Sequence, residues 1–175
     1  MGQRRLGYNR LMSFSRVAFA PEPARAHDLA PALELLRRLD LPEKGVLEQF
    51  GRFHVVRDDG RVVGLAGLEV YEPDGLLRSV AVEPTYRGQG LAAALVDACL
   101  GLARKTGLRA VYLLTTTAPD YFRRRGFTDC PREEAPAGIR ESWEFRAGCP
   151  STSAFMKRTV EPDGARSRTA SSRSS

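Results

Sequence analysis

The sequence predicts an α/β fold in which helices flank a central mixed β-sheet. An apolar stretch with β-branched residues, 76–82, leads through a glycine-containing turn into a helical pattern, which predicts a strand, a turn and a long helix. A second apolar strand is expected at 110–116, and a strand that follows such a helix lies parallel to the strand before it. Upstream, 52–57 and 61–71 form a predicted hairpin around two aspartates and a glycine, which adds antiparallel strands.

The N-terminal elements follow from apolar periodicity and from the prolines that end each pattern. Residues 16–20 are expected to form a short strand that Pro21 ends. Leucines at helical spacing predict an amphipathic helix over 27–39, and a short second helix is expected at 45–50.

The C-terminal elements are predicted in the same way. Residues 118–125 are expected to form a short helix that ends at Gly126, and 154–160 a final strand. Three proline-containing turns, Cys130-Pro131, Ala135-Pro136 and Gly148-Cys149-Pro150, are expected to be loops or irregular structure.

Length and charge limit the domain organisation and the kind of partner. The 175 residues suffice for one domain, expected at 16–160, with disordered extensions at 1–15 and 161–175. The formal net charge is +6, but residues 1–16 hold four arginines and no acid, whereas 17–160 holds 20 basic and 19 acidic side chains. A nucleic-acid-binding protein would carry its basic face on the folded domain, so no nucleic-acid partner is expected.

Cysteines, histidines and hydropathy exclude further classes. The three cysteines, at 99, 130 and 149, form no C-x-x-C pair, and their odd number argues against a disulfide framework. A reducing, cytoplasmic location is therefore expected. The two histidines are isolated, so no metal site is expected, and no apolar run approaches the roughly 18 residues of a membrane helix. We expect a monomer or homodimer without a membrane partner.

The turn before the long helix, Arg87-Gly88-Gln89-Gly90-Leu91-Ala92, has the features of a phosphate-binding loop. The first turn of a helix leaves four amide donors without partners, and the helix dipole adds about half a positive charge there. Glycines let the backbone bend sharply and let a phosphate approach closely. The dinucleotide fingerprint fails because Ala93 stands in place of its third glycine, and a P-loop lysine is absent. The competing interpretation is an ordinary tight β-to-α turn.

The spacing R-x-x-G-x-A at Arg87, Gly90 and Ala92 resembles the acyl-CoA loop of the GNAT superfamily of N-acetyltransferases. Residues 118–127 are similar to the second signature of that superfamily, A-x-x-F-Y-x-x-x-G-F, and the two signatures occur in the right order. The resemblance covers roughly residues 17–160. It implies the acyl-CoA N-acyltransferase (GNAT) fold, with acetyl-CoA as co-substrate.

Two groups within that superfamily look closest. The run Y-L-L-T-T-T-A-P-D-Y-F-R-R-R-G-F is similar to the acetyltransferase domain of bacterial N-acetylglutamate synthases. The run E-S-W-E-F-R-A-G-C-P-S-T-S-A-F-M at 141–156 resembles the small acetyltransferases encoded in arsenic-resistance operons. We favour the second group because its run is the more distinctive, although Gly148 stands where that group usually has leucine.

The resemblance implies a coenzyme site between two strands that splay apart, 76–82 and 110–116. Amides of the first strand would bind the pantetheine arm and the thioester oxygen, and amides of the loop would bind the diphosphate. Thr115 takes the place of the family's usual asparagine, and Phe122 would line the thiol site. The implied coenzyme contacts are Val80, Ala81, Val82, Arg87, Gly88, Gln89, Gly90, Leu91, Ala92, Thr115 and Phe122.

Acetyl transfer to an amine requires an unprotonated nucleophile, and amines such as that of lysine are almost wholly protonated at neutral pH. Glu69, at the end of a central strand near the expected cleft, is the candidate base; the alternative is a surface carboxylate that pairs with Arg78. Tyr121 is the candidate acid for the leaving thiol. The family signature usually places its tyrosine one residue later, so a packing role is the alternative.

Four further residues are candidate acceptor contacts, namely Arg78, Ser79, Thr116 and Ser142, and strand ends or solvated loops are the alternative interpretation for each. Cys130 and Cys149 each precede a proline. The resemblance to the arsenic-resistance group makes arsenical binding by these thiolates a hypothesis, with chance placement as its alternative.

The sequence therefore predicts an enzyme that transfers acetyl from acetyl-CoA to the amino group of a small, amino-acid-like acceptor, with arsenic resistance as one context. No cysteine or serine has an evident histidine partner, so direct attack in a ternary complex is expected rather than a covalent acyl-enzyme. Two alternatives stay open. One is acetylation of a protein N-terminus or lysine, and the other is a non-catalytic sensor that binds acyl-CoA or an arsenical.

Overall fold

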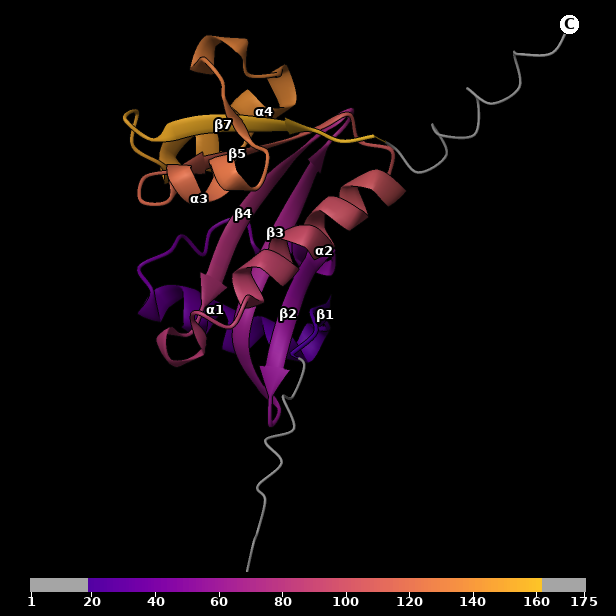
Figure 1. Ribbon diagram of the computed structural model, residues 1–175, viewed down its shortest axis with the longest axis vertical. Coiled ribbons are helices and arrows are strands. Elements are labelled where there is room, and N and C mark those ends of the chain that lie inside the picture. The colour runs from indigo at the N-terminus through magenta and orange to yellow at the C-terminus, as the bar shows by residue number, and fades with distance from the viewer. Residues whose placement is uncertain (1–18, 162–175) are drawn as a thin grey trace, which may run out of the picture.

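A mixed sheet runs through the structure, a computed structural model that describes residues 19–161 (Figure 1). Within those residues the sheet has seven strands in the order β1-β2-β3-β4-β5-β7-β6. Every neighbouring pair is antiparallel except β4 and β5. The strands are β1 (Glu22–Pro23), β2 (Phe53–Asp58), β3 (Arg61–Tyr71), β4 (Asp74–Val82), β5 (Ala110–Thr115), β6 (Thr128–Asp129) and β7 (Ala154–Thr159).

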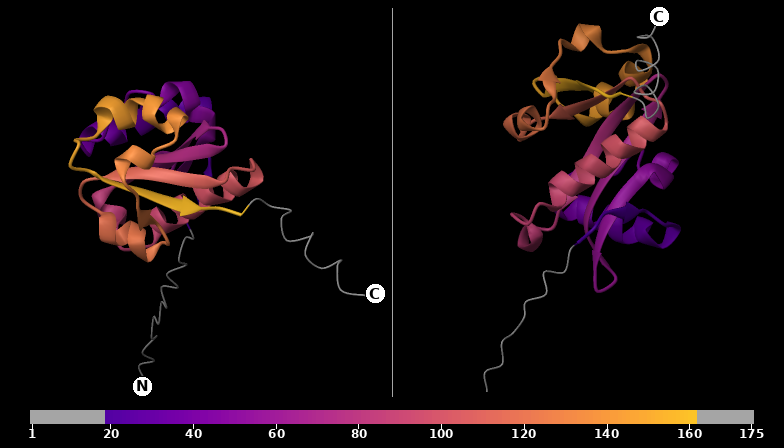
Figure 2. Two further views of the ribbon diagram at one scale, coloured as in Figure 1. Left: turned by 90° about the horizontal axis from the view of Figure 1, so that it is seen from above. Right: turned by 45° about the vertical axis from the view of Figure 1, so that its right-hand side comes forward.

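Helices cover both faces of the long strands, so the predicted fold class is confirmed (Figures 1 and 2). The α-helices are α1 (Leu29–Arg38), α2 (Leu91–Lys105), α3 (Pro119–Arg124) and α4 (Ala137–Glu141). Short 3-10 turns lie at Ala26–Asp28, Leu47–Arg52, Pro84–Tyr86 and Arg132–Glu134, and one π-helical turn lies at Glu144–Gly148. Successive residues of β3 point to opposite faces: Val63 packs in the core that α2 covers, and Val62 in the core that α1 covers.

The two parallel strands pair over only part of their length. Asp74, Gly75 and Leu76 of β4 face residues 110–112 of β5, and no pairing continues beyond Leu76. β5 instead pairs along its whole length with β7 on its other side. The expected parallel neighbours are therefore present, and they separate toward their C-terminal ends, which opens the middle of the sheet.

A β-bulge in β4 lies at this opening. Leu65 of β3 faces Ala81, whereas Gly67 faces Arg78, so β4 holds one more residue than β3 across this interval. Ser79 lies within it at φ 54°, a left-handed conformation that non-glycine residues seldom adopt. Bulges bend a strand and redirect its side chains, and strained residues of this kind gather at functional sites.

The expected strand at 16–20 is wrong where the structure describes it. Phe19 and Ala20 form no strand, residues 16–18 lie outside the described range, and the first strand is Glu22–Pro23 instead. It is a two-residue edge strand beside β2, where the missing amide of proline does no harm.

The proline-containing turns predicted at Cys130-Pro131, Ala135-Pro136 and Cys149-Pro150 lie outside helices and strands, as expected, whereas Gly148 ends the π-helical turn; α4 and two short helical turns lie between them. Pro131 and Pro136 stand at the N-caps of two of these elements, a place near the helix start where proline is tolerated, rather than interrupting them. The predicted disordered extensions fall outside the described residues, except for Glu161. Among the helices of residues 19–161, none has the length and apolar character needed to cross a membrane.

Candidate active site

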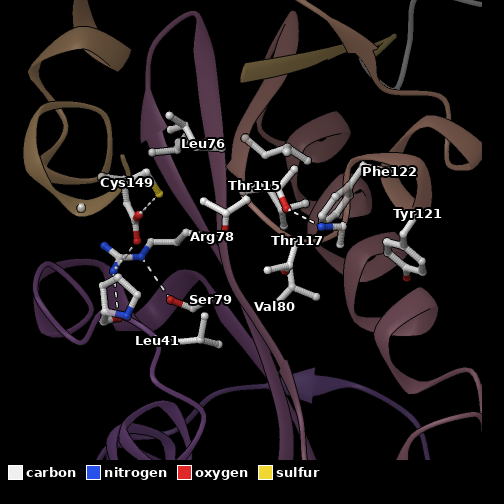
Figure 3. Close-up of a pocket in the computed structure, with 18 of the residues that line it drawn as sticks. Leu41, Leu76, Arg78, Ser79, Val80, Thr115, Thr117, Tyr121, Phe122 and Cys149 are labelled. Atoms are coloured by element: carbon white, nitrogen blue, oxygen red, sulfur yellow. Dashed lines mark hydrogen bonds and ion pairs between the residues drawn. The ribbon is translucent and has the colours of Figure 1, made fainter. Parts of the chain in front are cut away.

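A cavity of about 520 Å³ occupies the opening between β4 and β5 (Figure 3). Tyr121 and Phe122 of α3 lie at one end of it, Arg78 and Cys149 lie at the other, and Val80 lies between them. Its lining comes from the loop after α1, from β4, β5, α2 and α3, and from the segment before β7: Asp40, Leu41, Pro42, Leu76, Leu77, Arg78, Ser79, Val80, Ala92, Leu113, Leu114, Thr115, Thr116, Thr117, Ala118, Tyr121, Phe122, Glu144, Gly148, Cys149 and Pro150.

The glycine loop lies beside the cavity at the N-terminus of α2, where Ala92 belongs to the lining. Gly88 and Gly90 have φ values of 77° and 83°, and Gly90 is the N-cap of α2. Both glycines are exposed, and a side chain at either position would meet no heavy atom of residues 19–161 within 4 Å. Arg87 is exposed as well, with its Nε donating to the carbonyl of Val82 at 3.2 Å. The first-turn amides of α2 are thus open to an anion, and Ala92 carries this turn into the cavity lining.

The α3 end of the cavity is aromatic. Tyr121 and Phe122 pack edge to face with their ring centroids 5.1 Å apart. The hydroxyl oxygen of Tyr121 is buried and has no hydrogen-bond partner among the described residues. Burial raises the pKa of this phenol, so the hydroxyl keeps its proton across the neutral range. Thr115 accepts a hydrogen bond from the amide of Ala118 at 3.2 Å, which fixes the start of α3.

The opposite end of the cavity holds a buried ionic cluster centred on Arg78. Its side chain is 1% exposed, and Nη1 donates to Oε1 of Glu69 at 2.6 Å. Nη2 lies 2.8 Å from Oε1 of Glu144 and donates to the carbonyl of Pro42 at 3.3 Å, while Nε donates to the hydroxyl of Ser79 at 3.2 Å. Each nitrogen of the guanidinium is therefore engaged with the protein itself.

Glu69 belongs to this cluster but does not line the cavity. It is 3% exposed, and its second oxygen accepts a hydrogen bond from the hydroxyl of Tyr71 at 2.7 Å. Burial and this hydrogen bond raise the pKa of Tyr71. The alternative considered for Glu69, pairing with Arg78, is present, although the pair is buried rather than at the surface.

Glu144 does line the cavity, and sequence inspection did not select it. Its Oε2 accepts a hydrogen bond from Sγ of Cys149 at 3.4 Å. Burial raises its pKa, the nearby charge of Arg78 lowers it, and the carboxylate of Glu69 raises it again. Burial, together with Glu144, raises the pKa of Cys149 to about 11, so Cys149 is a thiol at neutral pH.

Comparison with known proteins decides the class to which this site belongs. A family model described as "Acetyltransferase (GNAT) family" matches residues 14–127. The chain belongs to this family. The predicted fold and enzyme class are thereby confirmed: the protein is a GNAT acetyltransferase.

The curated relatives of this GNAT chain are amino-acid acetyltransferases. The protein of that name from Azotobacter vinelandii is 34% identical over 134 residues, which are 70% of this chain and 31% of the relative. Its counterpart from Salmonella typhi is 29% identical over 134 residues, again 70% of this chain and 30% of the relative. The chain spans about a third of the length of these relatives.

Solved structures with this GNAT fold contain coenzyme A. N-acetylglutamate synthase from Neisseria gonorrhoeae, complexed with coenzyme A and N-acetyl-glutamate, superposes with a TM-score of 0.71 at 21% identity, covering 81% of this chain and 35% of that one. Rv2747 from Mycobacterium tuberculosis, in complex with CoA and NLQ, has a TM-score of 0.67 at 25% identity and covers 81% of this chain and 99% of that one. The predicted co-substrate agrees with both structures.

Four of the eleven predicted coenzyme residues line the cavity, namely Val80, Ala92, Thr115 and Phe122. The loop residues Arg87, Gly88, Gln89 and Gly90 lie just outside the lining, and Ala81, Val82 and Leu91 have buried side chains, so only their backbones could serve a ligand.

The predicted acceptor residues do not all line the cavity. Arg78, Ser79 and Thr116 line the cavity, whereas Ser142 does not. The hydroxyl of Ser142 donates to the carbonyl of Ile139 at 2.7 Å and accepts from the amide of Phe145 at 3.2 Å. Ser142 therefore joins α4 to the following π-helical turn, and we no longer count it as an acceptor contact.

The two cysteines of the arsenical hypothesis differ in their position relative to the cavity. Cys130 is buried outside the cavity lining, unlike Cys149. Within residues 19–161, no group of histidines, cysteines and carboxylates is arranged to hold a metal ion.

Proposed function

We propose that this GNAT protein transfers the acetyl group of acetyl-CoA to the amino group of a small, amino-acid-like acceptor. One observation carries the proposal: the cavity between β4 and β5 has the open N-terminus of α2 beside one end and a buried ionic cluster at the other. The names of the relatives, amino-acid acetyltransferase and N-acetylglutamate synthase, support an amino acid as acceptor.

The residues present fit a coenzyme at the α2 side. Free amides of the first helical turn, the helix dipole and Arg87 suit a diphosphate, and glycines at 88 and 90 leave room for it. The part of the cavity wall that lies between the side chains of Val80 and Phe122 is neutral and largely apolar, which suits a pantetheine arm. When bound there, acetyl-CoA supplies the activated acetyl group.

Tyr121 is the proposed proton donor to the departing thiolate. Tyr121 lines the cavity, its buried hydroxyl is unpaired among the described residues, and its raised pKa keeps it protonated. Glu69, which the sequence selected as base, is held by Arg78 and Tyr71 outside the cavity lining, so its part in proton transfer stays a prediction.

A coenzyme-release screen tests the proposal. Purified protein is given acetyl-CoA and a panel of amino acids, amines and short peptides, and free thiol is measured with a chromogenic disulfide. We expect thiol release that depends on a small acceptor and an acetylated product whose mass is confirmed. Release with peptides alone would favour the protein-acetylating alternative, and release with none would remove the proposal.

The link to arsenic resistance stays a prediction. The relatives reported above are acetyltransferases of amino acids, and their names contain no arsenical. Amino-acid arsenicals therefore belong in the same acceptor panel, beside their arsenic-free counterparts.

A further inference from the structure

We propose that Glu144 binds the ammonium group of the acceptor and accepts its proton before acetyl transfer. The inference rests on the proposed function and adds to it the residue that prepares the nucleophile. Three independent features of the structure lead to it: the position of the carboxylate in the cavity, its partners, and the backbone that presents it.

The position separates Glu144 from the base that the sequence favoured. Both carboxylates contact Arg78, but Glu144 lines the cavity and Glu69 does not. Glu144 is 6% exposed, so an ammonium that reaches it has left most of its water. A buried carboxylate is a strong partner for such a group, because a charge-assisted hydrogen bond replaces the water that both have lost.

The partners leave Glu144 able to take a proton. Arg78 touches one of its oxygens, and the other accepts only the weak hydrogen bond of the Cys149 thiol at 3.4 Å. The charged or titratable groups that face it are Arg78 from β4, Glu69 from β3 and Cys149 from the turn after the π-helical segment, and Tyr71 lies behind Glu69. With one cation for two carboxylates, the cluster has room for one more positive charge, which is the charge that an ammonium brings.

The backbone around Glu144 is unusual in a way that suits a functional residue. Glu144 opens a single π-helical turn, closed by the amide of Cys149 donating to its carbonyl at 3.1 Å, and such turns are rare and frequent at functional sites. A Cβ on Gly148 would lie 3.0 Å from Oε2 of Glu144 and 2.5 Å from the ring of Trp143. The carboxylate can therefore occupy its place because residue 148 has no side chain.

Atoms, protons and electrons balance in the proposed step. The carboxylate takes one N–H proton from the ammonium, and the freed lone pair forms the bond to the acetyl carbonyl carbon. The carbon–sulfur bond breaks, and its electron pair leaves with sulfur. The nitrogen then loses a second proton, which the thiolate receives by way of Tyr121, and Glu144 returns its own proton to water. The sum is one amide, one thiol and one released proton.

The test is the pH profile of kcat/KM for the acceptor that the screen identifies, measured in the wild type and in Glu144→Gln. The amide keeps the size of the side chain and can still bond Arg78 through its oxygen. At pH 7 we expect a loss of about 100-fold or more. The loss should shrink by about tenfold per pH unit toward the pKa of the amine, because the free amine then needs no base.

Two further variants make the result specific. Glu141→Gln changes an exposed glutamate three residues earlier and should leave kcat/KM within about twofold. Glu69→Gln changes the other carboxylate on Arg78 and should lower stability without the pH-dependent loss of rate. Acetyl-CoA affinity, measured by calorimetry, should stay within about threefold in all three variants.

Several outcomes would overturn the inference. A loss in Glu144→Gln that is the same at every pH assigns the residue a structural role, and a pH-dependent loss in Glu69→Gln alone assigns the base to Glu69. If Glu144→Gln does not fold, Glu144→Asp decides, because it keeps the charge: we expect a fall in kcat of about tenfold, and an unchanged kcat removes the proposal. An inactive wild type would remove the proposed function itself, whereas an active wild type with an equally active Glu144→Gln removes only this inference.

Discussion

The two ends of the cavity are built in different ways. At the proposed coenzyme end, beside α2, the chain offers backbone amides at the start of that helix. The side chains around these amides are small, apolar or exposed. At the acceptor end, buried ionic side chains from β3, β4 and the segment before β7 meet at Arg78. One end depends on a local turn, and the other depends on tertiary structure.

This difference suggests a physical reason why one part of such a site can change more readily than another. A turn that presents amides can be encoded in six consecutive residues and serves any ligand with a diphosphate. A charge cluster needs residues that lie far apart in the chain, so it can change with the acceptor while the fold stays the same. The experiments below treat the two ends as separable and are ordered by the size of the expected effect.

The largest effect is expected from Arg78→Met at the acceptor end. The substitution leaves the carboxylates of Glu69 and Glu144 buried without their cation, which should lower the free energy of unfolding by about 3–5 kcal/mol. Urea denaturation measures it. Arg37→Met removes an exposed ion pair with Glu43 and should cost less than about 1 kcal/mol. Equal losses in the two variants would show that the buried cluster does not hold the acceptor end together.

Gly148→Ala should damage the acceptor end alone. The new methyl group meets the ring of Trp143 and the carboxylate of Glu144, so these side chains must move, at a cost of about 1–3 kcal/mol. We expect a higher KM for the acceptor and unchanged calorimetric affinity for acetyl-CoA. The control is Gly101→Ala within α2, where only the end of Arg104 lies near and helix propensity should raise stability slightly. A weaker affinity for acetyl-CoA in Gly148→Ala would show that the two ends of the cavity are coupled, against the prediction that they are separable.

Gly90→Ala should damage the coenzyme end alone. Gly90 and Gly107 stand before and after α2 with φ values of 83° and 77°, and a Cβ on either meets no atom within 4 Å. Each alanine variant should therefore lose about 1–2 kcal/mol of stability through backbone strain alone. Only Gly90→Ala should also bind acetyl-CoA more weakly, by about tenfold, because the first-turn amides shift. Equal affinities in the two variants would argue against the loop as the diphosphate site.

The smallest effect concerns the thiol at the acceptor end. Only thiolates react with iodoacetamide, and the folded pKa of Cys149, about 11, lies above that of an ordinary thiol. Its alkylation at pH 8 should be slow and should rise with pH until about pH 11. Bound acetyl-CoA or acceptor should slow it further, whereas Cys130, outside the cavity lining, should react at one rate with and without ligand. Peptide mass spectrometry follows alkylation at both cysteines. Protection of Cys130 rather than Cys149 would show that the ligand does not bind in this cavity.

The strand, turn and helix at the proposed coenzyme end could be predicted because their signals are local. The strand, the glycine turn and the start of the helix are neighbours in the chain, so periodicity and loop spacing identify them together. Phe122 came from the second signature and Thr115 from the place of the family's usual asparagine, and both line the cavity. The splay of β4 from β5 was expected only from the family resemblance, and the bulge at Ser79 was not foreseen, because both depend on strand pairing that no local pattern specifies.

The acceptor end was predicted only in part: Arg78, Ser79 and Thr116 line the cavity as expected, but Glu144 was not selected. Glu69 was selected because it is a charge on an apolar strand, but the register of β3 against β4 places it behind Arg78, outside the cavity. Glu144 lies in a segment whose prolines favoured loops, and its π-helical turn leaves no periodicity to detect. The available signal was the one tryptophan of the chain, Trp143, beside it in a run already noted as distinctive.

The most direct test of the central claim is a calorimetric titration of acetyl-CoA into the wild type and into Thr117→Trp. Thr117 is exposed and lines the cavity, so a tryptophan there should fill the space between the strands without disturbing the core. We predict saturable binding at one site in the wild type and at least a tenfold weaker affinity in the variant. Binding of equal strength in both proteins, or no binding in the wild type, would contradict a coenzyme site between β4 and β5.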